Sequence, residues 1–418
     1  MHNAVVHKYL TVHAEREVDL LADFPASQNF DHCLVIPAYN ETAEFFTRLQ
    51  LGPLHRQNAL CILVINQPVS DADTRINDLL MQQICLSGEV LWHNQHLQLL
   101  RYGDNNGGSN NAWLVVDRFH SSDEPGNQET VDRRLPDREA VGLARKIGCD
   151  IAVALMARSQ IRSTWIHSTD ADVFLPRNYF DLPEPDGYSA AIYDFKHQND
   201  GSAVGRATAL YEQALHYYVK GLAWAGSPYA YHTIGSTLAI NARTYCHVRG
   251  FPRRSGGEDF YLLNKLAKLG KVHHVADATL RIKARESSRV PFGTGPAVAE
   301  IMRLANPDTD YTYYNPQTFV CLREWLTRIP QVWADLASDR NPLEHLSRAT
   351  AEAIEAADWP SIVQHLKKQA KNPAGGERAL HNWFDAFQTL KFIHYLQKHY
   401  HPALPLKDCL AQAEFIDQ

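Results

Sequence analysis

Short apolar runs, separated by stretches with helical spacing, recur along the first three hundred residues of the chain. Residues 33–37 and 60–65 are continuous apolar runs, as in strands that are buried within a parallel sheet. Other strands are predicted at 97–102, 188–193, 233–240 and 271–275, and one more ends at Asp170. Apolar residues at helical spacing predict helices at about 41–56, 138–158, 206–223 and 258–269. This alternation indicates an α/β fold in which helices cover both faces of a sheet.

The two ends of the chain have a different pattern. Residues 1–30 are polar and are expected to form an N-terminal leader before the α/β domain, which we place at 31–300. Later in the chain the sequence turns to helical segments rich in aromatic and charged residues, and we expect a helical C-terminal region at 301–418. The Pro- and Gly-containing segment 372–377 marks a break between two of these helices.

Composition limits the class of protein. With 418 residues, 45% hydrophobic and 21% charged, the chain can bury a sizeable core, and global disorder is not expected. The net charge is −6, so the chain lacks the excess of positive charge that is typical of nucleic-acid-binding proteins. Seven widely spaced cysteines without Cys-x-x-Cys predict reduced, buried thiols. No apolar stretch approaches the roughly 18 to 20 residues of a transmembrane segment, and a signal-peptide core is missing, so a soluble, cytoplasmic protein is expected.

The clearest candidate chemistry lies at residues 170–172, where Asp170 and Asp172 follow a predicted strand. Carboxylates at this spacing can bind Mg²⁺ or Mn²⁺, which take a few protein oxygens and complete their shell with water and substrate phosphates. One carboxylate would bind the ion directly, and the other would bind it through water or hold a sugar hydroxyl. A solvated turn is the alternative.

Three further polar clusters stand at element ends, where ligands of open α/β sheets bind. Residues 37–41, Pro-Ala-Tyr-Asn-Glu, could form a nucleoside pocket or only cap a helix. Asn66 follows the second strand and could hydrogen-bond a pyrimidine edge. Glu258 and Asp259 follow two glycines and open a helix. Their carboxylates could supply a general base or only stabilise the helix dipole.

Taken in order, these motifs resemble family 2 glycosyltransferases. The matching residues are 35–41, the Gly-x-Ala-Arg segment that ends at Arg145, Asp170-Ala-Asp172, and 256–259, and the resemblance covers about 32–290. It implies a GT-A (Rossmann-like) fold with a mixed, mostly parallel sheet flanked by helices. It also implies a hexosyltransferase-like enzyme with a nucleotide-diphospho-sugar donor, a Mn²⁺ or Mg²⁺ ion, and inverting transfer to an acceptor.

The resemblance also assigns roles to residues. Pro37, Tyr39, Glu41 and Asn66 would line the nucleoside pocket. Arg145 would contact the donor diphosphate. Asp172 would be the main metal ligand, and Asp170 would help with the metal or orient the donor ribose or sugar. Asp259 would be the base that deprotonates the acceptor, with Glu258 supporting it or the acceptor. All these expectations require that the Asp170 and Glu258 segments meet at one site.

Several features depart from the family pattern or remain open. The chain has Asn-Gln-Pro-Val at 66–69 where the family usually shows Asp-Asp-Gly-Ser, so the donor base is not assigned. A Gln-x-x-Arg-Trp motif is missing, which favours non-processive, single addition. His273 or His274 is either a further metal ligand or structural. The basic segment with Arg281, Arg285 and Arg289 is either a lid over the diphosphate or a solvated face.

Other functions and partners are also compatible with the sequence. A nucleotidyltransferase would use a similar scaffold and metal but would normally have a Gly-rich loop after the first strand, where this chain has Ala38, Tyr39 and Asn40. A non-catalytic nucleotide-sugar-binding protein is a third alternative, which the four carboxylates disfavour. The acceptor, a small molecule or a glycan, is not identified, and a homo-oligomer is compatible with the chain.

Overall fold

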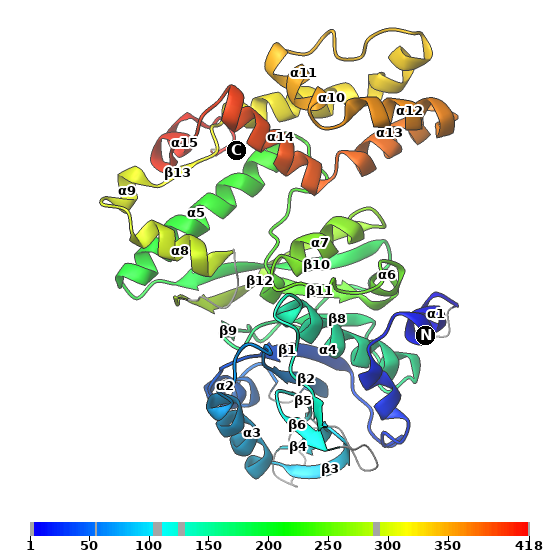
Figure 1. Cartoon of the computed structure of the whole chain (residues 1–418), viewed down its shortest axis with the longest axis vertical. Coiled ribbons are helices and arrows are strands. Elements are labelled where there is room, and N and C mark those ends of the chain that lie inside the picture. The colour runs from blue at the N-terminus through cyan, green and yellow to red at the C-terminus, as the bar shows by residue number, and fades with distance from the viewer. Residues whose placement is uncertain (1–3, 55–56, 103–110, 124–129, 287–292, 417–418) are drawn as a thin grey trace. The chain divides into compact units, whose positions relative to one another are not determined.

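The computed structural model describes residues 4–54, 57–102, 111–123, 130–286 and 293–416. The chain forms two compact units (Figure 1). The first consists of Met1–Gln198 and Thr233–Pro296, and the second of Asn199–His232 and Ala297–Gln418. The second unit therefore takes in a segment from the middle of the region 31–300. Each unit is described by itself below.

A ten-stranded sheet forms the centre of the first unit, in the order β3-β4-β5-β2-β1-β8-β11-β10-β12-β9. Its strands are β1 His32–Ala38, β2 Ala59–Asn66, β3 Glu89–Asn94, β4 Leu97–Arg101, β5 Ala112–Arg118, β8 Trp165–Ser168, β9 Val173–Phe174, β10 Tyr188–Gln198, β11 Leu238–Asn241 and β12 Lys271–Lys283. Among these described strands, β4, β9 and β11 run against the other seven. The expected α/β fold with a mixed, mostly parallel sheet is confirmed.

The central strands are apolar because both of their faces are covered. All eight residues of β2 are buried, and β2 lies parallel to β1 with Ile62 beside Val35. Helix α4 (Ala140–Ala157) packs against both strands. A Cβ at Gly148 would lie 2.4 Å from Val35 Cγ1, so this glycine lets the helix approach the sheet closely.

Helix α4 is itself covered by the N-terminal segment. All its residues from Gly142 to Met156 are buried, because α1 (Ala4–Val12) and the 3₁₀ helix η1 (Arg16–Leu21) pack against it. Two of its buried charges pair with each other: Lys146 Nζ lies 2.6 Å from Asp150 Oδ2. Asp150 also accepts a hydrogen bond of 2.5 Å from the Tyr9 hydroxyl of α1. Residues 4–21 are thus part of the first unit's packed structure.

Other elements complete the first unit. They are α2 Glu44–Leu51, α3 Arg75–Ser87, β6 Ser121–Asp123, β7 Thr130–Asp132, η2 Gly235–Thr237, α6 Ala242–His247 and α7 Glu258–Leu266. Strands β3 and β5 and the small β6–β7 sheet have no counterpart among the strands predicted from the sequence. Helix α8 (Thr294–Met302) carries the chain into the second unit.

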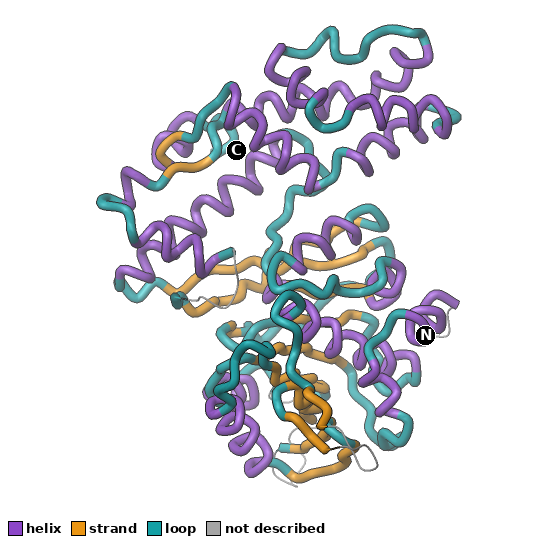
Figure 2. Tube along the Cα trace, in the orientation of Figure 1, coloured by secondary structure: helices purple, strands orange, loops and turns teal. Residues whose placement is uncertain are grey.

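The second unit is almost entirely helical (Figure 2). Its elements are α5 Ala203–Trp224, α9 Pro307–Asp310, β13 Thr312–Tyr313, α10 Gln317–Ala337, α11 Arg348–Glu355, α12 Trp359–Gln369, α13 Pro373–Trp383, α14 Ala386–His399, β14 Leu404–Pro405 and α15 Leu406–Gln412. Its core gathers Tyr217 of α5 with Trp325, Phe384 and Phe415. The expected helical C-terminal region is confirmed.

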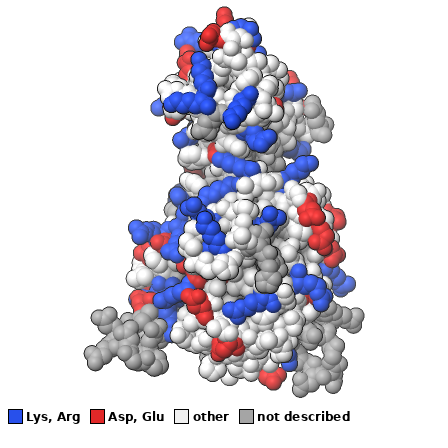
Figure 3. All heavy atoms as spheres, turned by 90° about the vertical axis from the view of Figure 1, so that its right-hand side faces the viewer, with Lys and Arg blue, Asp and Glu red and all other residues white. Residues whose placement is uncertain are grey.

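Two surface properties bear on function. In the described part of the chain, no helix combines the length and apolar character that a membrane crossing needs. Figure 3 shows positive and negative side chains interspersed on the face that it draws. That mixture fits the nearly balanced content of 41 basic and 47 acidic residues.

Candidate active site

The Asp170–Asp172 motif forms a tight turn after strand β8. The backbone N–H of Val173 donates to Asp170 O at 3.2 Å, which closes the turn around Ala171 and Asp172. The N–H of Lys283, at the end of β12, donates to Asp172 O at 3.0 Å. The expected position at the end of a strand is therefore what the structure shows.

Arg145 joins this turn to the start of helix α7. Its guanidinium donates to Asp170 Oδ1 at 2.7 Å, to Glu258 Oε1 at 3.0 Å and to Ser168 Oγ at 2.9 Å. The side chain is 3% exposed, so these charges interact in a largely desolvated environment. A Cβ at Gly235 would lie 2.7 Å from Arg145 Nη2, so a larger residue at this position would push against the guanidinium. The two carboxylate motifs that the sequence separates by almost ninety residues thus meet at one arginine.

Glu258 and Asp259 have different environments, although they are neighbours. Glu258 is buried against Arg145, whereas Asp259 is only partly buried and accepts the N–H of Phe260 on Oδ1 at 2.7 Å. Among the described residues, no hydrogen-bond partner is found for Asp259 Oδ2. Burial raises the pKa of Asp259 to about 7, Glu258 and Asp170 add to the rise, and Phe260 N–H and Arg145 oppose it. A carboxylate with a pKa near neutrality and an open oxygen is suited to accept a proton.

Asp172 faces a second arginine. Arg285 Nε lies 2.9 Å from Asp172 Oδ2, and Arg285 Nη1 lies 2.8 Å from Glu41 Oε1. Burial raises the pKa of Asp172 to about 6; Arg285 opposes the rise, and Asp170 and Glu41 contribute to it. Three carboxylates, those of Asp172, Asp170 and Glu41, therefore share one neighbourhood with positively charged arginine side chains.

The Asp170 and Asp172 carboxylates are suited to a divalent cation that prefers oxygen ligands. Asp172 and Asp170 offer hard oxygen donors, and burial with the neighbouring Asp170 and Glu41 carboxylates raises the pKa of Asp172. In the described part of the chain, however, no three His, Cys, Asp or Glu side chains are arranged as a metal cage. The donor set therefore suits an ion that takes one or two protein oxygens and completes its shell with water and phosphate, as Mg²⁺ and Mn²⁺ do.

The predicted nucleoside residues lie at the ends of β1 and β2. Pro37 is buried inside β1, in register with Val64, whereas Tyr39 lies just beyond the strand and donates its hydroxyl to Asp71 Oδ2 at 2.6 Å. Asn66 is 4% exposed, and its amide donates to Ala38 O at 3.1 Å. Asn66 thus fixes the backbone at the end of β1. Of these four residues, Glu41 is connected to Asp172, because Arg285 forms ion pairs with both carboxylates.

Two other groups of candidates are placed differently. His274 Nε2 lies 2.6 Å from Asp194 Oδ1, and the His273 ring lies 4.9 Å from that of Tyr188. Neither contact involves Asp170 or Asp172. In the basic segment, Arg285 reaches the site, whereas Arg289 is outside the described residues.

Sequence reasoning missed several residues that shape the site. Asn77 of α3 connects the ends of two strands, since its Oδ1 accepts Asn40 N–H at 3.0 Å and its amide donates to Asn66 O at 3.1 Å. Arg48 of α2 donates to Ala171 O at 2.6 Å. Neither Asn77 nor Arg48 belongs to a recognisable sequence motif, because each forms hydrogen bonds with backbone groups elsewhere in the chain. A helix residue whose partner is a backbone atom leaves no pattern to find.

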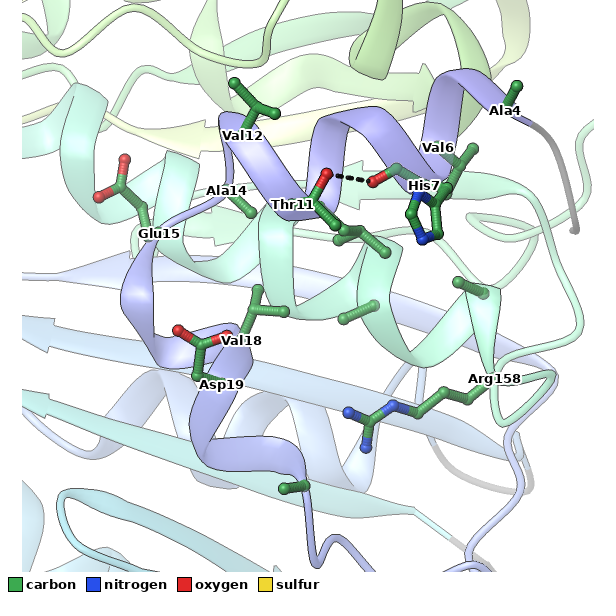
Figure 4. A pocket seen from close by; sticks show the side chains of 14 residues that line it. Ala4, Val6, His7, Thr11, Val12, Ala14, Glu15, Val18, Asp19 and Arg158 are labelled. Carbon is green, nitrogen blue, oxygen red and sulfur yellow. Dashed lines mark hydrogen bonds between the residues drawn. The ribbon is translucent and has the colours of Figure 1, made fainter.

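A separate groove of about 960 Å³ lies between α1, η1 and α4 (Figure 4). Apolar residues form much of its lining, and His7, Asp19 and Arg158 add polar groups. The lining includes none of the residues assigned to the candidate active site. We therefore do not assign this groove to the donor or the acceptor.

The fold and site together define an α/β protein in which carboxylate pairs meet at the carboxyl end of a mixed sheet. No model of a known protein family matches the sequence, and no curated protein matches it.

Among solved structures, the chain is similar to three complexes at low identity. They are S. aureus TarS 1–349 with UDP-GlcNAc (10% identity, TM-score 0.37, covering 81% of this chain and 73% of that one), the mannosyltransferase PcManGT from Pyrobaculum calidifontis with GDP-Man and Mn²⁺ (12%, 0.33, 90% and 93%), and GalNAc-T7 with UDP, GalNAc and Mn²⁺ (13%, 0.34, 90% and 59%). Because these scores are low, the function is argued below from the chain's own residues.

Proposed function

We propose that the chain is a metal-dependent glycosyltransferase that moves a sugar, a hexose by the family resemblance, from a nucleotide-diphospho-sugar to an acceptor hydroxyl. The observation that supports this most is the bridge from Asp170 through Arg145 to Glu258, with spacings of 2.7 and 3.0 Å. It supports a site in which the Asp170–Asp172 turn would bind a cation close to a general base at the start of α7. The cation would offset the charge that develops on a diphosphate leaving group, and the base would accept the proton of the acceptor hydroxyl.

In this proposal, Asp172 and Asp170 hold Mn²⁺ or Mg²⁺ through carboxylate oxygens. When bound, the ion supplies positive charge for the leaving nucleoside diphosphate. Arg285 contacts Asp172 and Glu41 and would exchange these carboxylate partners for diphosphate oxygens, which a guanidinium binds in bidentate fashion. We assign Arg145 to positioning, because its guanidinium is already engaged by Ser168, Asp170 and Glu258.

Asp259 is the proposed base. Its Oδ2 would accept the proton of the acceptor hydroxyl as that oxygen attacks the anomeric carbon, while the bond from this carbon to the diphosphate oxygen breaks. Attack from the face opposite the diphosphate inverts the anomeric centre. Glu258 keeps its ion pair with Arg145 and so holds the first turn of α7 in place.

The nucleoside would bind against Tyr39 and Glu41, with Pro37 and Asn66 shaping the backbone beneath them. The Asn66 amide already donates to Ala38 O, so we assign no residue to recognition of the donor's nucleoside base. The proposed enzyme is non-processive and releases its acceptor after a single addition. A cytoplasmic location is also part of it, and it rests on seven free cysteines, six of them buried.

A donor screen tests the proposal directly. The protein would be incubated with Mn²⁺ and a panel of UDP-, GDP- and dTDP-sugars, and release of nucleoside diphosphate would be followed with and without EDTA. We expect release with one donor class and its loss in EDTA and in Asp172→Asn. Asp259→Asn should keep nucleotide affinity but lose transfer.

The other outcomes identify other functions. Full activity in EDTA would contradict metal dependence. Release of pyrophosphate from a nucleoside triphosphate would indicate a nucleotidyltransferase. Nucleotide-sugar binding without turnover, with every acceptor tried, would indicate a binding protein. Asp73→Asn is a suitable control variant, since the Asp73 carboxylate pairs with Arg75 on the surface.

A further inference from the structure

The turn that carries Asp172 is short and needs external support. One internal hydrogen bond closes it, from Val173 N–H to Asp170 O at 3.2 Å. A carboxylate at the tip of such a turn can bind a cation well only if the backbone on each side of it is held. The question is which group holds the carbonyls that flank Asp172.

Arg48 holds both of them. Its Nη2 donates to Ala171 O at 2.6 Å and to Val173 O at 3.1 Å, the carbonyls immediately before and after Asp172. Hydrogen bonds from a charged guanidinium are roughly twice as strong as neutral ones. One side chain from outside the motif thus defines the backbone on both sides of the proposed metal ligand.

The guanidinium of Arg48 is held in turn. Its Cζ lies 4.1 Å from the centre of the Phe174 ring, a cation–π contact. Helix α2 is anchored beneath it: Phe45, Phe46 and Leu49 are buried, and the Phe46 ring lies 4.7 Å from that of Trp113 in β5. Arg48 therefore projects from a fixed helix.

We propose that Arg48 is a positioning residue for the metal-binding turn, setting the orientation of Asp172 through the Ala171 and Val173 carbonyls. This inference rests on the proposed function, because it assumes that Asp172 binds the cation. Arg48 touches neither reacting atoms nor, in this proposal, the ion itself. Groups that hydrogen-bond metal ligands directly typically contribute about 10- to 100-fold to metal affinity, and we take the lower end of this range for Arg48, which acts through the backbone.

Charge and positioning make opposite predictions here, which allows a sharp test. If Arg48 acted only as a nearby positive charge, it would repel the cation, and its removal would tighten binding. If it acts by positioning, Arg48→Lys should weaken binding although the charge is kept, since an ammonium lacks the planar geometry of the guanidinium. Arg281 provides a matched control: its Cζ lies 5.8 Å from the same Phe174 ring, and its side chain is exposed.

The experiment measures Mn²⁺ binding to the full chain by electron paramagnetic resonance, with Mn²⁺ alone as the probe. We expect wild type to bind Mn²⁺, Arg48→Lys to bind it at least about tenfold more weakly, and Arg281→Lys to match wild type. Phe174→Leu, which removes the ring under the guanidinium, should weaken binding by a smaller factor. Thermal unfolding would check that each variant is folded. If Arg48→Lys does not fold, Phe174→Leu still tests the inference.

Each remaining outcome has a definite meaning. Equal Mn²⁺ affinity in wild type and Arg48→Lys, with only a lower unfolding temperature, would show that Arg48 is structural, and the proposed function would stand. Tighter binding in Arg48→Met with no change in Arg48→Lys would show a pure charge effect and would overturn the inference. A wild-type protein that binds no Mn²⁺ would overturn both the inference and the metal dependence of the proposed function.

Discussion

At the scale of single residues, the site is built from carboxylates held close together by two arginines. Arg145 joins Asp170 to Glu258, and Arg285 joins Asp172 to Glu41. Removing one partner of a buried ion pair typically costs about 3–5 kcal/mol, because the other charge stays desolvated. Arg145→Ala should therefore destabilise the fold itself, and less drastic variants are better probes of function.

The pH dependence of stability should report on Asp259. Its pKa of about 7 is above the value of roughly 3.9 in an unfolded chain, so the native state binds the proton more tightly. Between those values the native protein holds more protons than the unfolded one, and the free energy of unfolding falls as pH rises. Asp259→Asn removes this loss and should gain about 1–3 kcal/mol relative to wild type between pH 4.5 and 8, a figure reduced for the partial exposure of the side chain.

Urea unfolding in EDTA at several pH values would measure this difference. Glu258, Arg145 and Asp170 face the carboxylate and are unchanged in the variant. Asp73→Asn is the control, because Arg75 lowers the pKa of Asp73 to about 2 and its titration lies below the window. Parallel curves for wild type and Asp259→Asn would contradict the raised pKa.

Arg285 should compete with a metal ion for Asp172. Its guanidinium is 2.9 Å from the carboxylate, so Arg285→Gln removes a positive charge that the ion would otherwise have to displace or tolerate. We expect Mn²⁺ alone to bind about three- to tenfold more tightly to this variant, as measured by paramagnetic resonance. Affinity for inorganic pyrophosphate should fall in the same variant. Weaker Mn²⁺ binding would mean that Arg285 helps to hold the site open for the ion.

At the scale of elements, close approach of backbones fixes the loop that leads to the proposed base, Asp259. Gly142 of α4 donates its N–H to Arg254 O at 2.9 Å, and a Cβ at this position would lie 2.4 Å from Pro252 O. The loop that leads into α7 therefore rests directly on α4. Arg145 is three residues further along the same helix, so one element supports both the loop and the ion pair.

Gly142→Ala should separate α4 from this loop. We expect a loss of about 1–3 kcal/mol in the free energy of unfolding, since the surrounding backbone must shift, and a larger fall in turnover than in nucleotide affinity. Gly375→Ala in α13 is the matched control, because the nearest atom to its added Cβ is a side-chain oxygen at 3.2 Å. Denaturation and steady-state kinetics would measure both. Equal effects of the two substitutions would contradict the role of Gly142.

At the scale of the whole molecule, the second unit is built from two separate stretches of chain. Tyr217 and Leu222 of α5 share a core with Trp325, Phe384 and Phe415, which lie more than ninety residues later. A cut at residue 300, the boundary expected from the sequence, would keep α5 but remove the residues that cover it. The apolar face of α5 would then be exposed.

A chain that ends at residue 300 should therefore aggregate or be degraded when it is expressed. A chain that lacks both Asn199–His232 and Ala297–Gln418, with a flexible linker across the first gap, should be more soluble. Light scattering and gel filtration would compare the two. Equal solubility would show that α5 does not depend on the C-terminal region.

The sequence by itself determined the strands and helices that have strong periodicity, and the order of the motifs at their ends. β1, β2, α4 and α7 were predicted close to their observed bounds, because continuous apolar runs and helical spacing depend on local burial alone. β5 was missed, although all but one of its residues are buried.

Only the tertiary structure decided which polar groups meet. Arg145 joins Glu258, which is more than a hundred residues away in the chain, to the nearer Asp170. Arg285 and Asp172 are also more than a hundred residues apart, and Arg48 supports the turn through distant backbone carbonyls. Such contacts depend on how the sheet and helices pack and leave no periodic trace in the chain. The carboxylates of the candidate site could therefore be proposed from the sequence, whereas Arg48, Asn77 and the contacts that join these residues could not.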